Sequence, residues 1–172
     1  FYGSLSEPMS CIIGGYHACY HTKPGVYTHD MGVTEGGNMA ILAGAGPMGL
    51  GCADYAIHGG RAPKMLIVTD LDDARLKRAE KLLPPEEAKK FGVDLRFINT
   101  GSIENPVEYL RSLTGGEGFN DVFVYAPVKP VVEMGDALLA RDGCLNFFAG
   151  PTNPEFSAMF NFYNVHYLST HI

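Results

Sequence analysis

The sequence contains no tryptophan, few charged residues and no paired cysteine motif. Only 19% of its 172 residues are charged and 46% are hydrophobic, which is typical of a globular chain with a sizeable core. None of the four cysteines stands in a CxxC pair, so the chain encodes no structural zinc knuckle. Cys52 and Cys144 lie in apolar segments, and we expect both to be buried thiols. Reduced cysteines favour a cytoplasmic setting.

Positive charge is also scarce. The net charge is −6 and the isoelectric point is about 5.4, so the chain has no field that would attract nucleic acid or an anionic membrane. No apolar run approaches the roughly 20 residues that a membrane helix needs. The chain starts on Phe1 without a signal peptide and stops at Ile172 in what reads as the start of a strand. We therefore expect a piece of a longer protein.

The rest of the chain is organised around residues 39–50, which read MAILAGAGPMGL. A short apolar run, suited to a buried strand, leads into a GxGxxG match and then a helical segment. In such a turn the first glycine permits the bend, the second lets backbone approach a pyrophosphate, and the third lets the helix pack closely. The alternative is a glycine-rich turn in an unrelated α/β domain. The candidate cofactor-binding residues of this turn are Gly44, Gly46, Pro47, Met48 and Gly49.

A second apolar strand, 65–69, ends at Asp70, about 20 residues past the last glycine. A carboxylate there can accept hydrogen bonds from the adenosine ribose, and it would repel the 2′-phosphate of NADP. The sequence therefore favours NAD, with NADP use still open. Arg75 is the nearest base. It either lies near the ribose and adenine or is a solvated helix residue.

Strands alternate with helices after residue 39, which predicts a doubly wound α/β fold, a Rossmann domain with parallel strands in the order 3-2-1-4-5-6. Strands are expected at 39–43, 65–69, 94–98, 121–125 and 144–148, with a sixth from Leu168. Helices are expected at 47–58, 72–83, 86–91, 105–113 and 130–140. Residues 1–38 are expected to be a lead-in helix and loop, and residues 39–172 the dinucleotide-binding domain.

The lead-in segment is less regular. A helix is predicted over 4–21, weakened by two adjacent glycines. A small hairpin could pair 26–28 with 31–33. His17 and His21 have the i, i+4 spacing of helical metal ligands, but no further ligand stands at a suggestive spacing, and packed or surface histidines are the favoured interpretation.

The ends of the fourth and fifth strands lie where a doubly wound sheet binds its ligand. Backbone groups there could meet the carboxamide of a nicotinamide, or they could be ordinary strand-to-loop transitions. Tyr125 and Lys129 match the YxxxK pair of short-chain dehydrogenases, but the pair needs one helical turn and a proline lies between the two residues, so we reject it. The candidate residues at these two strand ends are Ala126, Pro127, Ala149 and Gly150.

These motifs resemble a known family. GAGPMGL, VTDLDDARL and a strand ending in FFAG, preceded by EPMS and HAC, are similar to the cofactor domain of zinc-type medium-chain alcohol and polyol dehydrogenases. The run GDALLARDGCLNFFAGP resembles most closely the L-sorbose 1-phosphate reductases of the sorbitol dehydrogenase-like branch. The resemblance implies hydride transfer on a sugar or polyol and places Glu7 at or near a catalytic zinc. The other zinc ligands of the family come from a preceding catalytic domain, so this chain should bind nucleotide without catalysing alone.

Two other functions remain open from the sequence. An S-adenosylmethionine methyltransferase shares the glycine-rich first turn and the acid after strand two, although the glycine spacing suits a pyrophosphate. A non-catalytic nucleotide-binding module would also lack catalytic residues. By resemblance, the aromatic residues 160–167 are a candidate surface for homo-oligomer formation, or they pack internally against the sheet.

Overall fold

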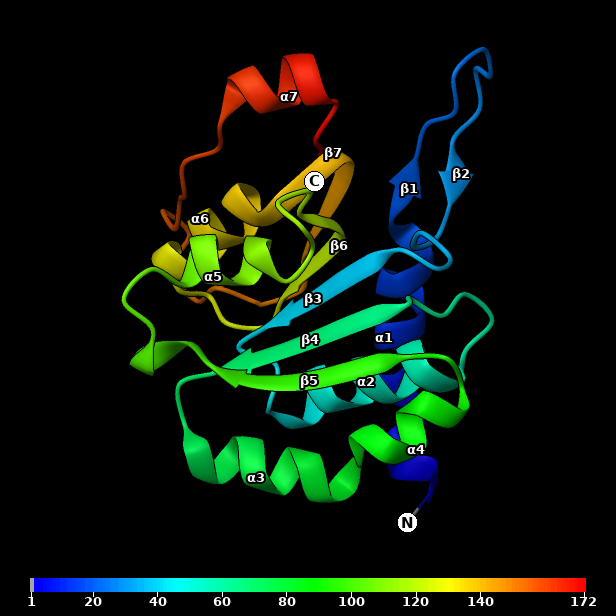
Figure 1. Cartoon of the computed structure of the whole chain (residues 1–172), viewed down its shortest axis with the longest axis vertical. Coiled ribbons are helices and arrows are strands. Elements are labelled where there is room, and N and C mark those ends of the chain that lie inside the picture. Colours follow the sequence, from blue (N-terminus) through cyan, green and yellow to red (C-terminus); the bar gives the residue numbers. More distant parts are fainter. Residues whose placement is uncertain (1) are drawn as a thin grey trace.

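A five-stranded parallel sheet forms the centre of the molecule in the computed structural model, which describes residues 2–172 (Figure 1). Its strand order is β5-β4-β3-β6-β7, which is 3-2-1-4-5 in sheet numbering, as the alternation of strands and helices predicted. The strands are β3 (Asn38–Leu42), β4 (Met65–Asp70), β5 (Asp94–Asn99), β6 (Phe119–Val124) and β7 (Leu139–Phe147).

Helices cover both faces of this sheet (Figure 1). They are α1 (Ser6–Ala18), α2 (Pro47–His58), α3 (Asp73–Leu82), α4 (Pro85–Lys90), α5 (Pro106–Ser112), α6 (Lys129–Leu138) and α7 (Phe162–Leu168), with short 3-10 turns at Tyr2–Leu5 and Thr100–Ser102. In Figure 1, α2 and α3 lie on one side of the sheet, and α5 and α6 on the other. None of the helices within residues 2–172 is long and apolar enough to cross a lipid bilayer.

The central strand β3 is buried along its whole length because its side chains pack into two hydrophobic cores, one on each face of the sheet. Successive side chains of a strand point to opposite faces. Met39 and Ile41 accordingly join the core under α1 and α2, whereas Ala40 and Leu42 join the core under α5 and α6. The all-apolar run that predicted this strand is the pattern expected for a strand covered on both faces.

At the expected position of the sixth strand the structure has a helix followed by one isolated β-bridge. Residues 162–168 form α7, and Ser169 ends this helix in the left-handed conformation with φ 58°. His171 then makes an isolated parallel bridge to Cys144, with hydrogen bonds on both sides of it. The prediction of a strand beginning at Leu168 was therefore wrong, although the chain does reach the sixth position of the sheet beside β7.

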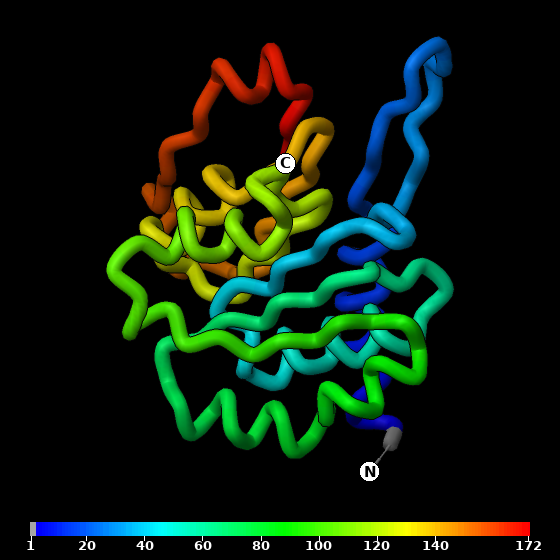
Figure 2. Tube along the Cα trace, viewed as in Figure 1, coloured from blue at the N-terminus to red at the C-terminus, as the bar shows by residue number. Residues whose placement is uncertain are grey.

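The lead-in segment differs most from expectation. The helix ends at Ala18 instead of residue 21, and Tyr20 and His21 form a strand, β1 (Tyr20–His21), which pairs antiparallel with β2 (Asp30–Met31). The predicted pairing of 26–28 with 31–33 was wrong, because the hairpin is longer and 26–28 lie near its tip. Figure 2 shows this hairpin as an arm that projects beyond the N-terminal ends of the sheet strands.

Candidate functional site

A cavity of about 300 Å³ opens at the carboxyl ends of β3, β6 and β7, where a doubly wound sheet binds its ligand. The glycine turn contributes Ala43, Gly46, Pro47, Met48 and Gly49 to its lining. The two strand ends contribute Tyr125, Phe148, Ala149 and Gly150. Elements far apart in the sequence thus converge on one hollow at the switch point of the sheet.

Different structural features explain the three glycines of the turn. A Cβ on Gly44 would lie 2.4 Å from Cγ2 of Ile41, and one on Gly49 would lie 2.3 Å from the carbonyl oxygen of Gly44. Both positions therefore exclude a side chain by internal packing. The bend itself falls elsewhere than expected, because Ala43 takes the left-handed conformation with φ 53°.

Gly46 is different. A Cβ there would meet no heavy atom of residues 2–172 within 4 Å, and its backbone is in the ordinary extended region. Internal packing therefore gives no reason for a glycine at this position. The open space faces the cavity, where it leaves room for a ligand to lie directly against the backbone.

The N-terminus of α2 points its free backbone N–H groups into this region. Gly46 caps the helix and Pro47 occupies its first turn, with no side-chain cap seen in the part of the chain that the structure describes. Uncapped N–H groups and the helix dipole together make a site for an anion. Arg78 of α3 adds a cation beside it, because its Nη2 donates to the carbonyl oxygen of Ala45 at 3.1 Å.

Asp70 ends β4 and is buried, with 9% of its surface exposed. Its Oδ1 accepts the backbone N–H groups of Leu71 and Asp72, at 2.8 and 3.2 Å, which fixes the carboxylate at the strand end. Arg75 lies exposed in the first turns of α3, with its Nε 3.9 Å from Oδ2 of Asp72. Neither Asp70 nor Arg75 lines the cavity.

Two aromatic rings form the wall of the cavity at the strand ends. Tyr125 and Phe148 pack with ring centroids 4.8 Å apart. Gly15 of α1 makes room for this wall, since a Cβ there would lie 3.3 Å from the Phe148 ring. Burial raises the pKa of the Tyr125 phenol, and its hydroxyl has no hydrogen-bond partner within residues 2–172. The adjacent glycines that weakened the helix prediction are thus explained in part by this contact.

Six of the predicted cofactor residues share the cavity, namely Gly46, Pro47, Met48, Gly49, Ala149 and Gly150. Gly44 supports the turn from behind, and Ala126 and Pro127 follow β6 outside the lining. Sequence reasoning passed over the side chains of Tyr125 and Phe148, although it named the strand ends that carry them. It also passed over Arg78, for which the only signal was its position one helical turn after Arg75.

Glu7 stands in the first turn of α1, exposed, and accepts a hydrogen bond from the Cys11 thiol at 3.2 Å. A catalytic zinc takes three protein ligands. Among residues 2–172 no three histidine, cysteine, aspartate or glutamate side chains are grouped to hold a metal ion. His17 and His21 lie on different elements, a helix and a strand. The residues of this chain therefore do not fit a zinc ion by themselves.

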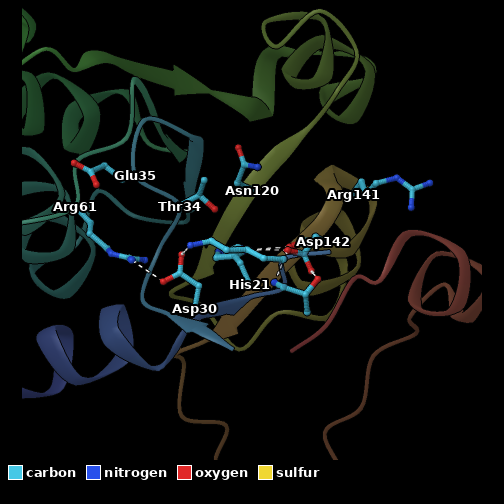
Figure 3. A pocket seen from close by; sticks show the side chains of 10 residues that line it. His21, Asp30, Thr34, Glu35, Arg61, Asn120, Arg141 and Asp142 are labelled. Carbon is cyan, nitrogen blue, oxygen red and sulfur yellow. Dashed lines mark hydrogen bonds and ion pairs between the residues drawn. The ribbon is translucent and has the colours of Figure 1, made fainter. Parts of the chain in front are cut away.

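A second hollow, of about 380 Å³, lies beside the β1–β2 arm, near the amino-terminal ends of β3 and β6 (Figure 3). Its charged groups are largely paired with one another. Asp30 bonds to Lys23 at 3.1 Å and to Arg61 at 2.8 Å, and Asp142 accepts both the N–H and the hydroxyl of Thr22. The bonds to Arg61 and Asp142 tie the arm to the domain, and the Lys23–Asp30 bond joins its two limbs.

His21 is the centre of this attachment. Its Nε2 donates to Oδ1 of Asp121 at 3.1 Å, and its Nδ1 donates to the carbonyl oxygen of Asp142 at 2.9 Å. Because both ring nitrogens face acceptors, the ring is best satisfied when doubly protonated. Burial opposes that charge, but the bonds to the two aspartates outweigh it and raise the pKa of His21. Asp121 also accepts the N–H of Thr34, so one buried carboxylate holds both limbs of the arm.

The sequence of this chain is similar to part of several longer known proteins. It is 59% identical to a mannitol-1-phosphate 5-dehydrogenase of Aliivibrio fischeri over 98% of its length, and 44% identical to an L-sorbose 1-phosphate reductase of Klebsiella pneumoniae over 99%. In both cases it spans only 40% of the relative. A structure described as a zinc-binding dehydrogenase from Sinorhizobium meliloti bound to NADP superposes with a TM-score of 0.71 at 16% identity, over 99% of this chain and 42% of the other.

The comparisons give no support to a methyltransferase or to a non-catalytic module. A family model described as zinc-binding dehydrogenase matches residues 47–172, which hold α2, the strands β4 to β7 and both strand ends of the cavity. The chain belongs to the zinc-binding dehydrogenase family.

Proposed function

We propose that this chain is the nucleotide-binding part of an NAD(P)-dependent, zinc-type dehydrogenase that interconverts an alcohol and a ketone of a polyol or sugar phosphate by hydride transfer. In this proposal residues 1–38 lead in from a catalytic domain and residues 39–172 hold the cofactor. The observation that carries it is Gly46, a glycine that no internal contact requires, at the uncapped start of α2 and facing a cavity.

In this proposal different residues of the chain hold different parts of the cofactor. The pyrophosphate would lie on the backbone N–H groups of Gly46, Met48 and Gly49, with Arg78 beside the same turn. Asp70 would accept the ribose hydroxyls, with Arg75 close to the same ribose or the adenine. The rings of Tyr125 and Phe148 would orient the nicotinamide, which supplies or accepts the hydride when bound.

Backbone groups at the two strand ends complete the proposed nicotinamide site. Ala149 and Gly150 line the cavity, and Ala126 and Pro127 follow β6 and its lining residue Tyr125. Peptide N–H and C=O groups in such a position can bond the carboxamide and hold one face of the ring toward the substrate. This chain's part in catalysis would be to position the ring, not to move a proton.

The substrate class and setting are inferred from the relatives and the chain itself. Both relatives are named after a phosphorylated sugar or polyol, which favours a substrate of that class here. Substrate contacts and most zinc ligands would come from outside these residues. Glu7 is the one residue of this chain proposed to lie at or near the zinc. Residues 160–167, several of whose aromatic side chains are exposed, are the proposed surface for a homo-oligomer. Four free thiols favour a reducing, cytoplasmic setting.

Calorimetric titration of the 172-residue chain with NADH, NADPH and S-adenosylmethionine tests this proposal. We expect NADH to bind, and Asp70→Asn to weaken it by about tenfold or more, since hydrogen bonds to a charged group are worth about 1.5–3 kcal/mol. Glu80→Gln, on the exposed surface of the neighbouring helix, is the matched control and should leave affinity unchanged. Equal affinity for NADPH would refute only the preference for NAD. Binding of S-adenosylmethionine alone, or of no nucleotide, would refute the proposed role of this chain as the part that binds NAD(P).

A further inference from the structure

Two adjacent glycines stand in the interior of α1, where glycine makes a helix less stable than alanine does. Gly14 is exposed, and a Cβ there would meet no heavy atom of the described residues within 4 Å. Gly15 is partly buried, and a Cβ there would lie 3.3 Å from Cδ2 and 3.4 Å from Cε2 of Phe148. The helix therefore contacts the Phe148 ring at residue 15, whereas at residue 14 it faces open space.

The ring that Gly15 contacts is part of the wall of the cofactor cavity. Phe148 lines this cavity of about 300 Å³, whereas Gly15 does not. The Phe148 ring also packs on Tyr125, the second aromatic residue of the wall, with ring centroids 4.8 Å apart. Phe148 therefore connects α1, which lies outside the lining, with the space in which the proposed nicotinamide would lie.

The backbone on both sides of this contact is held in place. The N–H group of Phe148 donates to the carbonyl oxygen of Val124 at 3.1 Å, which fixes the strand end against β6. Nδ2 of Asn146 donates to the carbonyl oxygen of Gly15 at 3.0 Å, which ties α1 to β7. Tyr16, the next residue of α1, is buried in the core. A side chain added at residue 15 would therefore displace the Phe148 ring, since neither the helix nor the strand end is free to move.

We propose that Gly15 is a positioning residue for the nicotinamide, an inference that rests on the proposed function. Because Gly15 has no side chain, the Phe148 ring lies against α1 and leaves the cavity wide enough for the ring of the cofactor. Gly15 touches neither cofactor nor substrate and acts through Phe148. An alanine at residue 15 requires the Phe148 ring to move by about a few tenths of an ångström, and a leucine requires a larger shift. Such a displacement narrows the cavity at the nicotinamide end.

The test is calorimetric titration of the 172-residue chain and its variants with NADH and with ADP-ribose, which lacks the nicotinamide of NADH. We expect Gly15→Ala to weaken NADH binding by about threefold and Gly15→Leu by about tenfold or more, because each crowds the Phe148 ring into the cavity. The affinity for ADP-ribose should change by less than about twofold in both variants. Gly14→Ala and Gly14→Leu, one residue away on the same helix, are the matched controls and should leave both affinities unchanged.

A double-mutant cycle with Phe148→Ala separates positioning of the ring from a general structural role of Gly15. Once the ring is removed, adding Gly15→Leu should change NADH affinity by less than about twofold relative to Phe148→Ala alone. A loss of NADH affinity that persists without the ring would overturn the proposal, as would an equal loss of ADP-ribose affinity. Unchanged NADH binding in Gly15→Ala would also overturn it, and this variant decides the question alone where Gly15→Leu does not fold.

Titration of the unchanged chain distinguishes failure of this inference from failure of the proposed function. If the unchanged chain binds NADH and the Gly15 variants bind it as the Gly14 variants do, the role of Gly15 is refuted and the nucleotide-binding function stands. If the unchanged chain binds neither NADH nor ADP-ribose, the proposed function is refuted, and the role of Gly15 is refuted with it.

Discussion

Replacing Asp121 by asparagine should unfasten the β1–β2 arm while keeping the shape of the side chain. The Asp121 carboxylate is only 2% exposed and accepts one bond from His21 and one from the N–H of Thr34. An asparagine keeps a single acceptor oxygen and turns an NH2 group toward one of these two donors. His21 would then keep only Asp142, whose Oδ2 lies 3.7 Å from its Nδ1.

Breaking a buried ion pair by removing one partner costs about 3–5 kcal/mol. Because Asp142 still faces the ring, we expect the lower end, a loss of about 3 kcal/mol in the free energy of unfolding. For a chain of this size each kcal/mol corresponds to about 2–4 °C in Tm, so the melting temperature should fall by about 6–12 °C. Calorimetry or circular dichroism at pH 6 measures it directly.

The effect should depend on pH with a definite sign. The folded-state pKa of His21 is raised above its unfolded value of about 6.5, so this contribution is fully present below pH 6.5 and is lost as the pH rises through the folded-state pKa. The difference between wild type and Asp121→Asn should therefore shrink as the pH rises above about 6.5. Asp30→Asn, on the same arm but paired with partly exposed Lys23 and Arg61, should cost below about 1 kcal/mol. Equal losses for the two variants, or a difference that does not change with pH, would refute the reasoning.

Two other substitutions test local features. Ala43→Gly should raise the free energy of unfolding by about 1 kcal/mol, because Ala43 holds a left-handed φ of 53° that costs an alanine about 1–2 kcal/mol, and a denaturant midpoint that falls would contradict this. Tyr16→Phe should lower it by about 1 kcal/mol, because the Tyr16 hydroxyl donates to the carbonyl oxygen of Arg61 at 2.5 Å in the core under α1, and an unchanged urea midpoint would contradict that.

Local sequence signals predicted the parts of the fold that local physics decides. The helix predicted at 47–58 has those bounds, since a proline suits the first turn and a glycine follows its end. The strands at 65–69 and 94–98 were each one residue short. Here the apolar pattern, the turn residues and the caps all agree, and no distant contact competes with them.

Distant contacts decided the rest. Tyr20 and His21 leave the predicted helix for a strand because Asp121, a hundred residues later, holds the His21 ring in place. Likewise, Arg78 reaches the Ala45 carbonyl only because the fold lays α3 beside the glycine turn. No pattern within the arm or the helix encodes these partners, so sequence reasoning found the cofactor region but not all the side chains that shape it.

The central claim is that the glycine turn holds a pyrophosphate, and Gly46→Ala tests it most directly. A Cβ at Gly46 would meet nothing in the described part of the chain, so we expect an unchanged Tm together with NADH binding weakened by about tenfold or more. Gly60→Ala, equally unobstructed but away from the cavity, should change neither. Gly49→Ala should instead destabilise the fold, since its Cβ would clash with Gly44. A Gly46→Ala protein that folds normally and binds NADH as tightly as wild type would contradict the account.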